Sequence, residues 1–128
     1  MKFMIALILI STSAAYADYG TIECKGTAGV YRLSLDEMSE ITKETSHLRI
    51  GTQDIALASV RAQSSDFGLL SLTLVRGKGP GATKYVFKNL GSSKCFSVYE
   101  SKQSGKARLE VINSMGVIGR ADCKCSQD

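Results

Sequence analysis

Basic side chains gather in the second half of the chain, between residues 76 and 108. They are Arg76, Lys78, Lys84, Lys88, Lys94, Lys102, Lys106 and Arg108, and with Glu100 as the one acidic residue this stretch has a net charge of +7. Residues 18–66, in contrast, have a net charge of −3. A basic surface attracts anionic partners, such as lipid headgroups, acidic polysaccharides or acidic proteins. The competing interpretation is that these lysines keep the protein soluble and protect edge strands.

A hydrolytic site is the catalytic alternative. His47 is the one histidine of the chain, so a multi-histidine metal site is excluded, and the sequence indicates no cofactor. A histidine can act as a general base beside a nucleophile and a carboxylate, but no Gly-x-Ser-x-Gly motif occurs here. Asp36, Glu37, Glu40 and Glu44 form an acidic cluster, and paired carboxylates can hydrolyse glycosides at a suitable separation. Such residues are more often solvated, so we expect a non-catalytic protein.

The stretch from Gly77 to Lys84 is the strongest turn signal in the chain. It resembles a phosphate-binding loop only superficially, because it lacks the final Gly-Lys-Ser/Thr and lies between two predicted strands. We interpret it as a glycine-rich hairpin loop, whose backbone freedom suits a contact surface. A second alternative function follows, in which residues 77–83 insert into the active site of a secreted hydrolase and inhibit it.

Four cysteines, Cys24, Cys95, Cys123 and Cys125, predict two disulfide bonds in an exported domain. A bond between Cys123 and Cys125 would close a very tight loop, which disulfide geometry disfavours. Cys24 and Cys95 are therefore each expected to pair with one of the two C-terminal cysteines, in either combination. The alternative is a four-thiolate zinc site, but the spacing contains no paired zinc knuckle.

The N-terminal segment has the features of a signal peptide. Lys2 precedes the apolar residues 3–10, and Ala15 and Ala17 provide the small residues of a cleavage site. The apolar run is shorter than the roughly 20 residues that span a bilayer. The sequence therefore predicts a signal peptide over 1–17, a single domain over 18–128 with no further membrane-spanning segment, and a secreted or periplasmic location.

Apolar and polar residues alternate along most of residues 18–128, which is typical of strands with one buried face. Examples are Tyr31, Leu33 and Leu35, then Leu72 and Leu74, then Tyr85 and Phe87. Glycine-rich turns between these runs favour an antiparallel meander. We expect an all-β fold, a small barrel or two-sheet sandwich of about eight strands, in which strands 20–25 and 118–125 pair and close the sheet. A capping-box pattern at Ser34 and Glu37 predicts a short helix over 35–43.

These observations predict an exported, non-catalytic binding domain. Its basic hairpins and Gly-Pro loop would contact an anionic protein, polysaccharide or lipid headgroup. Nucleic acid is not expected as a partner, because the chain is predicted to be exported and only 7% of its residues are aromatic. The inhibitor and the small hydrolase using His47 remain the alternative functions.

Overall fold

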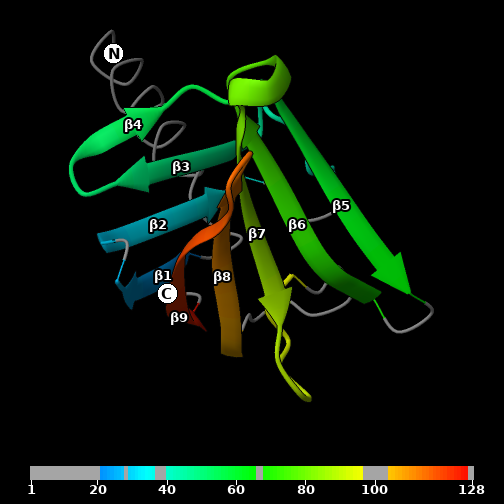
Figure 1. Cartoon of the computed structure of the whole chain (residues 1–128). Coiled ribbons are helices and arrows are strands. Elements are labelled where there is room, and N and C mark those ends of the chain that lie inside the picture. The colour runs from blue at the N-terminus through cyan, green and yellow to red at the C-terminus, as the bar shows by residue number, and fades with distance from the viewer. Residues whose placement is uncertain (1–20, 28, 37–39, 66–67, 97–103, 127–128) are drawn as a thin grey trace, which may run out of the picture.

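The computed structural model describes residues 21–27, 29–36, 40–65, 68–96 and 104–126. The predicted signal peptide (1–17) and Lys102 lie outside these residues. Within them the chain forms antiparallel strands and one short 3₁₀ turn (Figure 1), so the predicted all-β class is confirmed. No helix in the described ranges is long and apolar enough to cross a membrane.

Nine strands form one sheet. They are β1 (Thr21–Gly26), β2 (Gly29–Leu35), β3 (Ser46–Ile50), β4 (Gln53–Ile55), β5 (Ser59–Ser65), β6 (Gly68–Arg76), β7 (Thr83–Asn89), β8 (Gly105–Asn113) and β9 (Gly116–Ser126). The 3₁₀ turn η2 (Gly79–Gly81) lies in the predicted glycine-rich loop between β6 and β7. The strand order in space is β4-β3-β2-β1-β9-β8-β7-β6-β5.

The sheet curls into a half-barrel (Figure 1). The expected pairing of the first and last strands is present, since β1 and β9 are antiparallel neighbours from Thr21–Ser126 to Gly26–Ala121. This pairing lies in the middle of the sheet, however, and the two edges are β4 and β5. The prediction that the β1–β9 contact closes the sheet is therefore wrong, because those strands join two arms that each end at a free edge.

The inner face of the sheet carries the core. Tyr31 and Leu33 from β2, Leu72 and Leu74 from β6 and Phe87 from β7 are all at most 4% exposed. Because side chains alternate across a strand, the same strands present polar residues on the opposite, outer face. The period-two pattern in the sequence therefore predicted the inner face correctly.

Two disulfide bonds, Cys24–Cys123 and Cys95–Cys125, fix the C-terminal strand. The first crosses between paired positions of β1 and β9, and the second ties β9 to the connection between β7 and β8. The excluded Cys123–Cys125 bond is absent, and all four sulfur atoms are in these bonds, so the zinc alternative is wrong. Both bonds are buried on the inner face, as expected for cysteines two residues apart in one strand.

The helix predicted over 35–43 does not form in the described residues. Leu35 is the last residue of β2, and residues 43–45 form a turn; residues 37–39 lie outside the described ranges. The Thr45 hydroxyl donates to the Glu40 carbonyl oxygen at 2.8 Å and accepts from the Thr42 amide at 2.9 Å. Side-chain hydrogen bonds of this kind satisfy backbone groups outside a helix. The capping-box pattern at Ser34 and Glu37 predicted a helix here. The alternation of apolar residues through Leu35 favoured a strand, and the strand is what forms.

Candidate basic interface

The outer face of β7 and β8 carries four of the predicted basic residues. Lys84 and Lys88 alternate with the buried Tyr85 and Phe87 along β7, and Lys106 and Arg108 occupy the equivalent face of β8. All four side chains are exposed. Strand pairing therefore brings together cations that are up to 24 positions apart in the sequence.

Register places cations directly opposite one another at two positions. Lys88 of β7 faces Arg108 of β8, and Lys106 of β8 faces Lys124 of β9. Side chains at such positions have their Cβ atoms about 4.5–5.5 Å apart, and like charges there are destabilising. We call Lys88, Lys106, Arg108 and Lys124 the basic quartet. It spans three adjacent strands on one face of the sheet.

Acidic side chains neutralise this face only in part. Glu110 lies within 3.7 Å of Lys88 and within 3.4 Å of Arg120, so one carboxylate is shared by two cations. Glu23 pairs with Arg32 of β2 at 2.9 Å. Considering the described residues alone, neither Lys106 nor Lys124 has a carboxylate within ion-pair distance.

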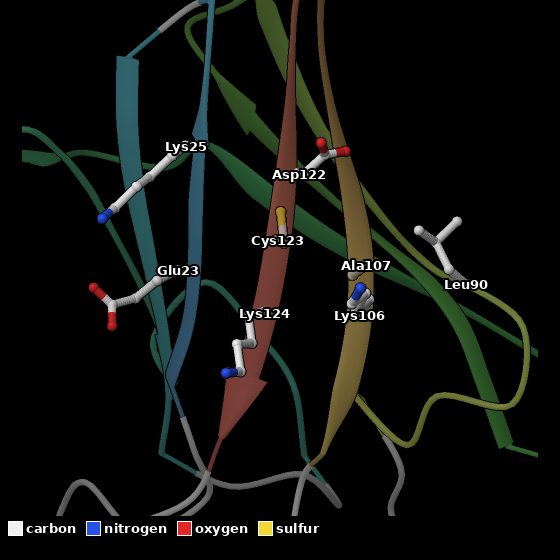
Figure 2. A pocket seen from close by; sticks show the side chains of 8 residues that line it. All are labelled: Glu23, Lys25, Leu90, Lys106, Ala107, Asp122, Cys123 and Lys124. Carbon is white, nitrogen blue, oxygen red and sulfur yellow. The ribbon is translucent and has the colours of Figure 1, made fainter.

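A shallow hollow of about 740 Å³ lies over β1, β9 and β8, next to the quartet. It is lined by Glu23, Lys25, Leu90, Lys106, Ala107, Asp122, Cys123 and Lys124 (Figure 2). Figure 2 shows the Glu23 carboxylate directed away from Lys124, which agrees with its ion pair to Arg32. Three lysines and two acidic residues therefore line the hollow, and one of the two carboxylates, that of Glu23, is already paired with Arg32. Such a surface can receive a negatively charged group.

The other predicted basic residues lie elsewhere. Arg76 and Lys78 are exposed at the loop between β6 and β7, and Lys94 is exposed in the connection between β7 and β8. Lys102 lies outside the described residues. Lys25 and Lys124 were not predicted as site residues, because a window of neighbouring residues cannot include a strand from the far end of the chain. The expected β1–β9 pairing was the signal that could have placed them beside the hairpin.

His47 lies on the outer face of β3 and contacts a member of the acidic cluster. Its Nε2 is 3.0 Å from the Asp36 Oδ2, so this pair is an ion pair when the histidine is protonated. Ser46, its neighbour in sequence, points to the inner face and is only 4% exposed. Among described residues, no group of three or more His, Cys, Asp or Glu side chains is arranged to hold a metal ion. The geometry gives an exposed histidine–carboxylate pair, with Ser46 on the opposite face.

The loop over residues 77–83 is exposed at its tip and shaped by glycine. Gly77 and Gly79 have φ values of 84° and 66°, in the left-handed region that favours glycine, and Pro80 follows in η2. Lys78 is exposed between the two glycines. The loop is thus a tight hairpin connection, and Lys78 and Pro80 are exposed side chains that the inhibitor alternative could use.

Comparison of the chain with family models, curated proteins and solved structures gives no match.

Proposed function

We propose that this protein is an exported, non-catalytic domain that binds an anionic partner through the outer face of β7, β8, β9 and β1. The observation that carries the proposal is the basic quartet. Two like-charged pairs occupy directly opposed positions, where their repulsion opposes pairing of the strands. On their other sides Arg108 faces Asp122 and Lys124 faces Glu23, and these carboxylates offset part of that repulsion. A bound anion would offset that repulsion. Solubility alone would not require the cations to lie directly opposite one another, whereas anion binding would.

The hollow beside the quartet supports the same proposal. Lys106 and Lys124 line it without a carboxylate partner among the described residues. Lys25 of β1 also lines it, with its ammonium directed away from those two lysines (Figure 2). Ammonium groups that are not engaged within the protein are available to sulfate, phosphate or carboxylate groups. Export of the chain rests on the predicted signal peptide and fits the two disulfide bonds.

Retention on immobilised heparin, with a salt gradient for elution, tests the proposal. The variant Lys106→Gln/Lys124→Gln removes two charges from the quartet and should elute at clearly lower salt, because exposed charges are screened as ionic strength rises. The matched control is Lys43→Gln/Arg61→Gln, which removes two exposed charges from the turn before β3 and from β5. Equal elution of the two variants would contradict the assigned face. If the unmutated protein bound neither heparin nor anionic vesicles, the proposed function would be refuted.

A further inference from the structure

Apolar side chains are exposed at the hairpin that joins β8 to β9. Met115 in the turn is 87% exposed, and Val117 and Ile118 at the start of β9 are 43% and 53% exposed. We call these three residues the apolar tip. Single exposed apolar residues are ordinary, whereas apolar residues exposed together can mark an interaction site.

The apolar tip contains a β-bulge. Val111 pairs with Gly119, and the next residue, Ile112, pairs with Val117, so Ile118 is an extra residue without a partner in the ladder. A bulge bends its strand and re-aims the side chains beside it. As a result, the successive residues Val117 and Ile118 are both exposed.

Other hairpins reach the same end of the sheet. Because the strands are antiparallel, the β1–β2, β3–β4, β6–β7 and β8–β9 turns all lie there. Val30, 48% exposed, lies just after the β1–β2 turn, and the Thr27 hydroxyl donates to the Arg120 carbonyl oxygen, which joins that turn to β9. Residues 26–30, 51–52, 77–82 and 113–118 include no Asp or Glu.

Exposed cations lie at the same end of the sheet as the apolar tip. They are Arg76 and Lys78 at the β6–β7 turn, Lys84 at the start of β7, and Arg120, which is paired with Glu110. Lys84 is the nearest along the pairing, because it faces Ile112, and Ile112 faces Val117. An apolar tip with cations beside it is complementary to one kind of surface, in which negative groups overlie an apolar layer.

We propose that the partner is an anionic lipid bilayer and that the apolar tip inserts at the level of its headgroups. This inference rests on the proposed function and names its partner. Apolar side chains that enter the boundary between headgroups and acyl chains add their burial to the attraction between cations and anionic lipids. A bilayer can surround the tip on all sides because it is fluid, whereas a folded acidic protein would need a socket shaped to enclose Val117 and Ile118 together.

A single introduced tryptophan provides the direct test, since the chain contains none. Met115→Trp should show a blue-shifted emission and protection from acrylamide when equimolar phosphatidylcholine–phosphatidylglycerol vesicles are added. Pure phosphatidylcholine vesicles should leave its emission unchanged. The matched control is Ala62→Trp, at an exposed position of the edge strand β5, away from both the apolar tip and the basic quartet. An equal response from Ala62→Trp, or no response from Met115→Trp, would overturn the insertion.

A second variant separates this inference from the proposed function. Val117→Ser/Ile118→Ser should weaken binding to the anionic vesicles by about tenfold or more, given the burial lost from two aliphatic side chains. Its elution from heparin should be unchanged, because the basic quartet is intact. Undiminished vesicle binding by this variant, with heparin binding retained, would overturn insertion of the tip and leave the basic interface alone responsible for the binding. If the unmutated protein bound neither heparin nor anionic vesicles, the proposed function itself would be refuted.

Discussion

The two faces of β7 and β8 are built from alternate residues of the same strands. Residues paired across the strands attract one another on the inner face and repel one another on the outer face. On the inner face Phe87 lies opposite Leu109, and both are fully buried. On the outer face, one position along, Lys88 lies opposite Arg108. The apolar pair stabilises the sheet and the basic pair opposes it. This difference places core stability and the proposed anion binding on separate sets of side chains, so each can be changed without touching the other.

The largest effect should come from the disulfide bonds on the inner face. Cys24→Ala/Cys123→Ala opens a loop with a sequence separation of 99 and should lower the free energy of unfolding by about 4–5 kcal/mol. Cys95→Ala/Cys125→Ala opens one of 30 and should cost about 1 kcal/mol less. Urea denaturation of both variants checks the order. A larger loss from the shorter loop would contradict the loop-entropy explanation.

Truncating the inner face should be nearly as costly. Phe87→Ala leaves a cavity between β6 and β8 and should lower the free energy of unfolding by about 3–5 kcal/mol. Its heparin elution, measured where the variant is still folded, should match that of the parent protein. If elution moved to lower salt in proportion to the lost stability, the two faces would not be independent.

Reversing one charge of the basic quartet should have a smaller effect on stability, and of the opposite sign. Lys106→Glu places opposite charges at the position facing Lys124 and should raise the free energy of unfolding by about 0.2–1 kcal/mol. The same change should weaken heparin binding. Lys43→Glu, outside the sheet, is the control for the change in net charge. Lower stability of Lys106→Glu would mean that the quartet is not a site of repulsion.

The last effect should be confined to alkaline solution. Burial, with a smaller contribution from the nearby Tyr85, raises the pKa of Tyr31 above its ordinary value of 10.0. The unfolded chain therefore loses this proton at a lower pH than the folded chain does. Stability should be unaffected at neutral pH and should fall as the pH rises above about 10. Tyr31→Phe should make the decline shallower in thermal melts followed across this range.

The core was predictable from the sequence because alternation is a local property. Leu33, Leu74 and Phe87 belong to runs in which each residue indicates the face of the next. The disulfide pairing was reduced to two combinations by geometry, but the choice between them depends on the register of β9 against β1. The free edges at β4 and β5 were not predicted either, because the curl of a sheet is a property of all its strands together.

The grouping of the basic residues was predictable only where it is local. Lys84 and Lys88 were placed on one face because they lie in one strand, and Arg108 joined them through an expected hairpin. Lys124 enters from the far end of the chain, and its place beside Lys106 depends on pairing register rather than composition. The apolar tip was also missed, because Val117 and Ile118 were interpreted as part of an ordinary strand, without the bulge that exposes both.

The order of the strands has a consequence for how the chain could be connected. Every neighbouring pair in the sheet is consecutive in sequence except β1 with β9, whose ends Thr21 and Ser126 are paired. A peptide linking these two ends, with new termini opened at residues 56–58 between β4 and β5, would make spatial order identical to chain order. The half-barrel is thus a circular permutation of a simple nine-strand meander, and Cys24–Cys123 fastens the one contact that its present connectivity makes distant.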